Sequence, residues 1–182
     1  MLSPISSYGY SKMSAENYII LFNKLYKLPF IILRLSNVYG HYQKSDNDGV
    51  INLFCQKILN NELPSIYGSG TQNRDFIFVS NVITAFIKSI TINKRNFILN
   101  VSTNRSKSIL RVVKIISNQL NKKLSPRYLT SKSGDIKASV LNNSKAKILS
   151  WKPRVKIEEG IKETLYFLSK IDKIKKIPHN KK

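Results

Sequence analysis

Apolar residues recur at helical spacing in the first stretch of the chain. Between Ser7 and Lys27 they fall three or four positions apart, which predicts one amphipathic helix, capped by Ser6 or Ser7. The next stretch, from Pro29 to Leu35, is almost continuously apolar and has the length of a strand. Such a run predicts a strand buried on both faces of a parallel sheet. A helix followed by such a strand is half of a βαβ unit.

The rest of the chain alternates between strand-like and helix-like patterns. A polar loop is expected from Asn37 to Asp48, and a glycine-rich turn from Tyr67 to Thr71. The expected strands are Arg74–Val79 and Asn96–Val101, and the expected helices are Val50–Leu59, Asn81–Ile90, Ser108–Asn121 with Ser108 as N-cap, Ser144–Leu149 and Ile157–Ile171. Because no repeat or low-complexity linker interrupts them, the pattern predicts one compact α/β unit.

Composition narrows the class of protein. With 182 residues, of which 42% are hydrophobic, the chain is long enough to bury one core. It has no apolar run of the roughly 20 residues that a membrane-spanning helix needs, and the segment Met1 to Lys12 lacks a secretory-signal pattern. The single cysteine, Cys55, excludes an internal disulfide and is typical of a reducing, cytoplasmic setting.

The charge of the chain raises the question of a polyanionic partner. It has 31 basic and 10 acidic residues and a formal net charge of +21. The basic residues are spread along the chain, and no helix-turn-helix, zinc-knuckle or RNA-binding aromatic pattern accompanies them. We therefore expect no nucleic acid and no membrane as partner, although an anionic small ligand could exploit the same field.

A tyrosine and a lysine four positions apart suggest acid–base chemistry. Tyr8 and Lys12 would lie one above the other on the first predicted helix. A nearby ammonium favours the phenolate form of a tyrosine, which can then move protons on sugar hydroxyls. The spacing alone is weak evidence, because Tyr128–Lys132 and Tyr166–Lys170 repeat it. Any such pair can equally be a half-buried tyrosine beside a solvated lysine.

The residues around Tyr8 carry a more specific signal. Residues 3–16 closely resemble the active-site helix of the NAD-dependent epimerase/dehydratase branch of the extended short-chain dehydrogenase/reductase family, where the usual run is Ser-Pro-Tyr-Gly-x-Ser-Lys-x-x-x-Glu. The resemblance continues in the same order along nearly the whole chain. The further matching segments are Leu33-Arg34-Leu-Ser-Asn37-Val-Tyr-Gly40, Ile66 to Val79, Asn100-Val-Ser, Gly134-Asp135, Ser144-Lys-Ala146 and Leu149-Ser-Trp-Lys-Pro153.

The resemblance implies a fold, ligands and residue roles. The fold would be the C-terminal part of an α/β enzyme, with a partial Rossmann-like parallel sheet and a smaller α/β substrate-binding region. Residues 1–40 would be a remnant of the Rossmann domain, residues 41–172 the substrate-binding region, and residues 173–182 a basic tail. NAD is the implied cofactor, a UDP-sugar is the implied substrate, and no metal is implied. The implied catalytic and cofactor-binding residues are Tyr8 and Lys12, and the implied substrate-binding residues are Asn37, Val50, Tyr67, Arg74, Lys132 and Asp135.

Three of these positions have an ordinary alternative. Asn37 could be a turn residue, Tyr67 a core residue, and Arg74 a surface arginine paired with Asp75. The flanking motifs favour the binding roles for Asn37 and Arg74 and leave Tyr67 open. A planar guanidinium suits phosphate oxygens, and the glycine turn before Arg74 permits close approach.

Departures from the family pattern bear on activity. Asn142 stands where the family often has Asp, Ser150 and Ser102 replace the usual Gly, and Ser80–Asn81 replaces two acidic residues. No three of the 7 glycines have the Gly-x-Gly-x-x-Gly spacing of the cofactor fingerprint. We therefore expect a truncated chain that is inactive alone and binds no NAD by itself.

UDP-hexose 4-epimerase is the activity that the resemblance favours. A nucleotide-sugar 4,6-dehydratase or a 4-keto-sugar reductase of the same family is the first alternative. A non-catalytic fragment, or one half of a split protein, is the second. The expected protein partner is accordingly a second copy of the chain or a separately encoded Rossmann half.

Overall fold

The structure is a computed structural model that describes residues 3–43, 49–131 and 136–175, with side chains up to residue 171. In chain order its elements are α1 (Ser7–Tyr26), β1 (Ile31–Leu35), β2 (Asn37–Tyr39), α2 (Val50–Leu59), β3 (Ser65–Tyr67), β4 (Asn73–Phe78), α3 (Val79–Thr91), β5 (Phe97–Val101), β6 (Ser106–Ser108), α4 (Ile109–Gln119), β7 (Arg127–Leu129), β8 (Ala138–Ser139), the 3₁₀ helix η1 (Ser144–Leu149) and α5 (Ile157–Lys175).

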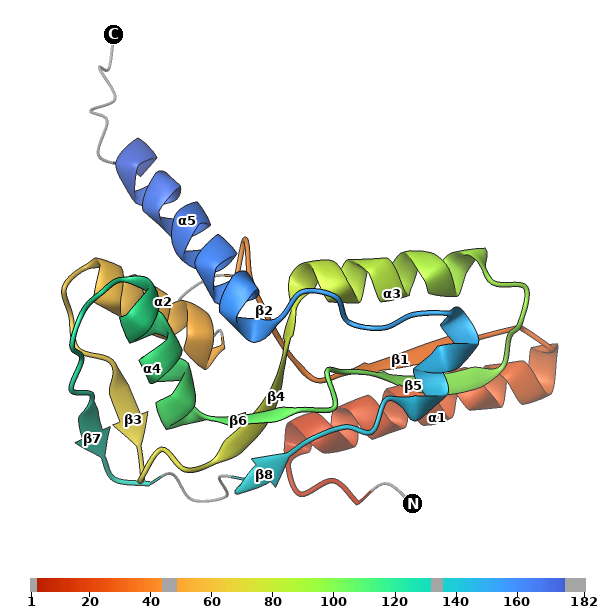
Figure 1. The fold of residues 1–182 in the computed structure, drawn as a ribbon. Coiled ribbons are helices and arrows are strands. Elements are labelled where there is room, and N and C mark those ends of the chain that lie inside the picture. Colours follow the sequence, from red (N-terminus) through yellow and green to blue (C-terminus); the bar gives the residue numbers. More distant parts are fainter. Residues whose placement is uncertain (1–2, 44–48, 132–135, 176–182) are drawn as a thin grey trace, which may run out of the picture.

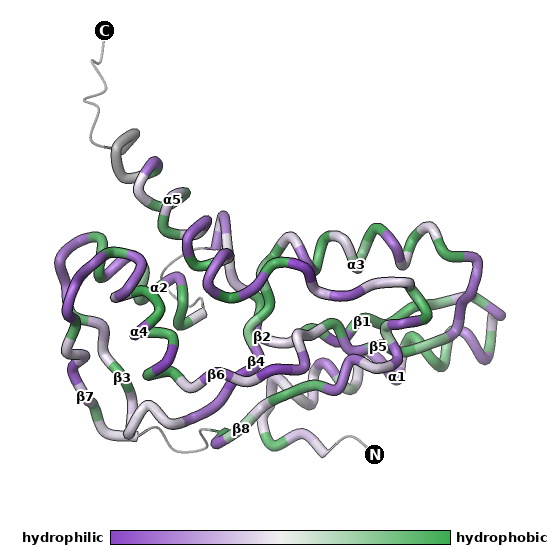
Figure 2. The backbone as a smooth tube through the Cα atoms, in the orientation of Figure 1, coloured by the Kyte–Doolittle hydropathy of each residue, from purple (hydrophilic) through white to green (hydrophobic). Residues whose placement is uncertain are grey.

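One part of the fold has three layers. β1 and β5 pair in parallel, with Leu33 opposite Leu99, and they lie between α1 and α3 (Figure 1). Figure 2 shows hydrophobic stretches along both strands and on α3. Ser6 caps α1 by accepting a hydrogen bond from the Gly9 N–H at 3.1 Å. The core of this part gathers Ile77, Ala85, Leu99, Val101, Ala146, Leu149 and Trp151.

β1 is less buried than its sequence predicts. Ile32 is the only buried residue of the strand, and Leu35 is exposed. Among the described strands β1 pairs with β5 alone, and α1 has no buried residue. The prediction of burial on both faces is therefore wrong for this chain, because one edge of β1 and much of the covering helix have no neighbour within the described residues.

The other part packs three helices on the sheet that is centred on β4. β4 runs parallel to β2 and β8 and antiparallel to β6, with Arg74 opposite Lys107. β3 and β7 form a separate parallel pair. The helices α2, α4 and α5 contact one another, because buried residues recur at helical spacing in α2 and α5. These residues are Ile51, Phe54, Cys55 and Ile58 in α2 and Ile161, Leu165 and Leu168 in α5.

The long elements confirm the sequence prediction, and the short ones depart from it. Helices form at α1, α2, α3, α4 and α5, and Ser108 caps α4 by accepting a hydrogen bond from the Arg111 N–H at 3.2 Å. Asn37–Tyr39, the start of the predicted loop, form strand β2, and Ser144–Leu149 is a 3₁₀ helix. In the described part of the chain, no helix combines the length and apolar character needed to cross a membrane.

Candidate functional site

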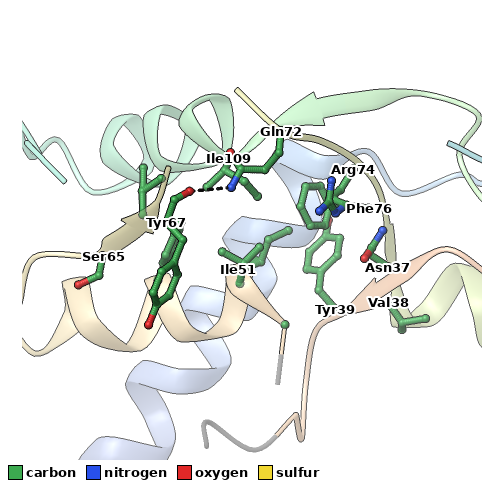
Figure 3. A pocket seen from close by; sticks show the side chains of 14 residues that line it. Asn37, Val38, Tyr39, Ile51, Ser65, Tyr67, Gln72, Arg74, Phe76 and Ile109 are labelled. Atoms are coloured by element: carbon green, nitrogen blue, oxygen red, sulfur yellow. Dashed lines mark hydrogen bonds between the residues drawn. The ribbon is translucent and has the colours of Figure 1, made fainter. Parts of the chain in front are cut away.

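A cavity of about 470 Å³ opens where β2, β3 and β4 meet α2 and the start of α4. Small-molecule sites have volumes of about 300–1,000 Å³. The wall contains Asn37, Val50, Tyr67 and Arg74, which are four of the positions that the sequence assigns to substrate binding. Figure 3 shows Tyr67 on one wall, with Arg74 and Asn37 on the other. The fold thus brings together residues from four different elements.

Strand β4 sets the direction of Arg74. Neighbouring strand residues face opposite sides, so Arg74 and Phe76 face the cavity and Asp75 faces away. Asp75 is fully buried, and its carboxylate accepts hydrogen bonds from the Thr103 N–H at 3.0 Å, the Thr103 hydroxyl at 2.7 Å and the Asn104 N–H at 3.0 Å. The alternative of a surface arginine paired with Asp75 is therefore not the arrangement found.

A glycine turn joins β3 to β4 at the cavity. Gly70 has a φ of +74°, and a Cβ at this position would lie 2.8 Å from Leu110 Cγ, so the turn requires glycine here. The Gln72 side-chain amide donates to the Tyr67 carbonyl at 3.0 Å (Figure 3). Because Tyr67 is 41% exposed, it is a wall residue of the cavity, and the core alternative is wrong.

Two asparagines fix β2 beside the cavity. The Asn37 amide donates to the Asp75 carbonyl oxygen at 3.1 Å, so Asn37 is held against β4. The buried Asn52 accepts from the Gly40 N–H at 3.3 Å and donates to the Gly40 carbonyl at 2.8 Å. This ties the end of β2 to α2, where Val50 begins the helix. Sequence reasoning missed Asn52, because nothing in a helical pattern distinguishes a buried asparagine from a solvated one.

Tyr39 is a second wall residue that sequence reasoning missed. Its side chain is buried, and its hydroxyl donates to the Ile157 carbonyl at 3.4 Å. Burial, with smaller contributions from Glu158, Cys55 and Glu159, raises the pKa of Tyr39 well above its ordinary value. The hydroxyl therefore stays protonated and contributes packing and a hydrogen bond to the site.

Tyr8 and Lys12 lie in a separate groove of about 640 Å³ between α1 and β1. Tyr8 is 71% exposed, and Lys12 Nζ lies 5.3 Å from the centre of the Tyr8 ring. Glu16, one turn further along α1, accepts from Arg34 Nε at 2.8 Å and Nη2 at 2.5 Å. This two-contact ion pair fixes the helix that carries the tyrosine and lysine to strand β1.

The groove and the cavity are lined by residues that lie close together in sequence at the end of β1. Leu35 lines the groove, and Asn37, two residues later, lines the cavity.

The other Tyr-x-x-x-Lys pairs show that spacing does not identify the site. Lys170 Nζ lies 4.8 Å from the centre of the Tyr166 ring in α5, which is close to the value in α1. Tyr128 lies in strand β7, so helical stacking does not apply to it. Lys132 and Asp135 lie outside the described residues, and their assigned roles stay predictions.

Comparisons with known proteins identify what the chain is similar to. The sequence profile of the NAD dependent epimerase/dehydratase family matches residues 1–102. A putative UDP-glucose 4-epimerase of Methanocaldococcus jannaschii is 36% identical over 168 residues, which cover 92% of this chain and 54% of that protein.

Solved structures give the same picture. The UDP-glucose 4-epimerase of Thermotoga maritima, with UDP-glucose, has a TM-score of 0.89 at 33% identity; the match covers 93% of this chain and 55% of that one. The dTDP-glucose 4,6-dehydratase of Bacillus anthracis, in complex with NAD, has a TM-score of 0.87 at 29% identity; the match covers 95% of this chain and 55% of that one. The chain spans about half the length of the relatives it matches.

Proposed function

The chain belongs to the NAD dependent epimerase/dehydratase family, and from this premise we propose that it supplies the sugar-nucleotide site and the acid–base pair of a UDP-hexose 4-epimerase. The observation that carries the proposal is the cavity in which Asn37, Val50, Tyr67 and Arg74 meet. NAD is the cofactor of this family. The similarity to an epimerase with UDP-glucose supports a UDP-hexose as the ligand.

The ligand would lie across the cavity with its diphosphate at Arg74. A guanidinium offers coplanar N–H donors to phosphate oxygens. Tyr67, on the opposite wall, offers an aromatic face to the base, and Val50 lines the same space. The hexose would then lie at Asn37, at the end of the cavity nearest the Tyr8 groove.

Tyr8 and Lys12 would carry the proton transfer. When bound, NAD supplies the transient oxidation of the sugar carbon. Tyr8 accepts the hydroxyl proton as general base and returns it as general acid. The Lys12 ammonium, 5.3 Å from the ring centre, would hold a positive charge over the tyrosine ring and offer a donor to the cofactor ribose. The open groove around this pair has room for that end of the cofactor.

A complementing α/β half would complete the enzyme. β1 pairs with β5 alone among the described strands, and apolar side chains are exposed on both flanking helices. They include Tyr18, Phe22 and Leu25 of α1 and Phe86 and Ile90 of α3. An open strand edge beside exposed apolar helices is a typical interface. A complementing Rossmann half would cover this surface, a second copy of the chain is the alternative, and the chain alone is expected to be inactive.

Calorimetric titration of UDP into the purified chain tests the cavity. UDP is expected to bind saturably, and Arg74→Gln should weaken its binding at least tenfold, because a hydrogen bond to a charged group contributes about 1.5–3 kcal/mol. Arg111→Gln is the matched control, since it removes the same charge from an exposed position of α4 and should leave UDP binding unchanged. Equal affinity in the wild type and Arg74→Gln would refute the assignment. Titration of NAD into the chain alone should show no saturable binding at micromolar concentration.

A 4,6-dehydratase or a 4-keto-sugar reductase is the second candidate, favoured by the near-equal structural similarity to the dehydratase. With the complementing half supplied, NMR of the products separates the two. Interconversion of UDP-glucose and UDP-galactose supports the epimerase, and loss of water from a nucleotide-glucose supports the dehydratase. UDP binding without either reaction would favour a non-catalytic chain.

A further inference from the structure

A second cavity, of about 330 Å³, adjoins the first and shares Phe76 with it. Its charged wall residues are Arg105, Lys107, Arg154, Lys156 and Glu158. Four cations and one carboxylate therefore surround a small volume. In the part of the chain that the structure describes, the ion pairs are Arg34–Glu16 and Lys57–Glu62, so none of these four cations is paired there.

The cationic cluster begins on the sheet. Lys107 lies directly opposite Arg74 on neighbouring antiparallel strands. Side chains in this relation point to the same face, with Cβ atoms about 4.5–5.5 Å apart. Lys107 thus adds a positive charge beside Arg74 at the boundary of the two cavities.

Two buried polar side chains fix the loops that present the arginines. Asp75 accepts three hydrogen bonds from the β5–β6 loop just before Arg105. Asn81, 3% exposed, accepts from the N–H groups of Arg154 at 2.9 Å and Val155 at 3.1 Å, and donates to the Val155 carbonyl at 2.9 Å. Loop backbone groups and the Thr103 hydroxyl therefore meet the hydrogen-bonding needs of both buried groups. The arginines extend from an ordered backbone, which lowers the cost of binding.

We propose that this second cavity binds a small phosphate anion, such as inorganic pyrophosphate or the phosphate chain of a nucleotide, at a site distinct from the sugar-nucleotide cavity. The guanidinium groups of Arg105 and Arg154 match phosphate oxygens, and Lys107 and Lys156 add compact positive charges. The volume suits a small molecule rather than a nucleic-acid duplex. The site does not depend on which reaction the family cavity supports.

Calorimetric titration of pyrophosphate at physiological ionic strength tests this site. The wild type should bind one equivalent, and Arg154→Gln/Lys156→Gln should lower the affinity at least tenfold. Both side chains are exposed, so the variant should keep its fold, which circular dichroism checks. Lys114→Gln/Lys162→Gln removes the same charge from exposed positions outside the cavity and should bind pyrophosphate as the wild type does.

Three results would overturn the proposal. The first is the absence of saturable pyrophosphate binding, and the second is an equal loss of pyrophosphate affinity in the control double variant. The third is a loss of pyrophosphate affinity in Arg74→Gln with no loss in Arg154→Gln/Lys156→Gln. Retained UDP binding by the latter variant separates this site from the proposed function. Titration of a nucleoside triphosphate distinguishes the two ligand sources. If the triphosphate binds more tightly than pyrophosphate, and Arg154→Gln/Lys156→Gln loses this binding, the ligand is a nucleotide. If both bind equally, the site recognises the phosphate chain alone.

Discussion

Substitution of Gly160 by alanine tests how α5 is seated against the cavity wall. Gly160 lies in the first turns of α5, and a Cβ there would overlap Tyr39 Oη and lie 2.9 Å from Phe78 Cδ2. Both rings are buried, and their centroids lie 5.5 Å apart. Neither ring can therefore move aside without disturbing the other.

Two opposing contributions decide how much Gly160→Ala changes the free energy of unfolding. Alanine is favoured over glycine in a helix by about 1 kcal/mol. Overpacking a filled core costs about 1–3 kcal/mol, and displacement of the Tyr39 ring also breaks the hydrogen bond from its hydroxyl to the Ile157 carbonyl. Because the overlap involves buried aromatic atoms, the cost of overpacking should lie at the upper end of this range. We expect Gly160→Ala to lower the free energy of unfolding by about 1–2 kcal/mol.

Urea denaturation followed by circular dichroism measures this change, and a double-mutant cycle assigns it. Tyr39→Phe removes the overlapping oxygen and leaves the contact with Phe78. In that background Gly160→Ala should cost about 1 kcal/mol less than in the wild type. If Gly160→Ala is neutral or stabilising, or costs the same in both backgrounds, the packing argument fails.

Four further predictions concern groups that hold the fold together. Arg34→Met should lower the free energy of unfolding by about 1–2 kcal/mol, since it leaves the Glu16 carboxylate, 14% exposed, without its partner, and hydrogen exchange in α1 should accelerate. Glu62→Gln, which breaks an exposed ion pair, should cost less than about 0.5 kcal/mol. Burial raises the pKa of the Cys55 thiol from 9.0 to about 12, so the folded chain holds this proton more tightly than the unfolded chain. The free energy of unfolding should therefore fall as pH rises from about 9 towards 12, less steeply in Cys55→Ala, and Ellman's reagent should react only after unfolding. Asn81→Ala should lower the free energy of unfolding by about 1–3 kcal/mol. It should also lower the affinity for pyrophosphate, because it frees the loop that begins at residue 154. Unchanged pyrophosphate affinity in a folded Asn81→Ala variant would contradict the role given to that loop.

The long elements were predictable because their signal is local. Apolar periodicity over ten or more residues identified the helices, and the hydroxyl of Ser108 identified a helix start. The three-residue strands β2, β3, β6 and β7 carry no such signal, since hydrogen bonds to distant strands define them. The error at β1 has a related cause: the sequence shows that a strand is apolar, but burial depends on neighbours.

The candidate site was predictable only in part, for the same physical reason. Family motifs identified Asn37, Tyr67 and Arg74, which the structure places in one cavity. The buried Asp75 and Asn81 read as ordinary polar residues, because their partners lie 28 to 74 positions away along the chain. The second cavity draws its charge from segments that are separated by nearly 50 residues, so only the fold could bring them together.

The alternation along β4 has a consequence for how this chain can change in evolution. Arg74 and Phe76 face the cavities, while Asp75 and Ile77 face the other layer. Deletion or insertion of one residue within β4 would exchange these two sets beyond the point of change, placing a carboxylate at the phosphate position or an arginine in the core. The turn before β4 does not set this phase, because β4 is held in register by β2, β6 and β8. We therefore expect homologous chains to vary the length of the turn and to keep the length of β4.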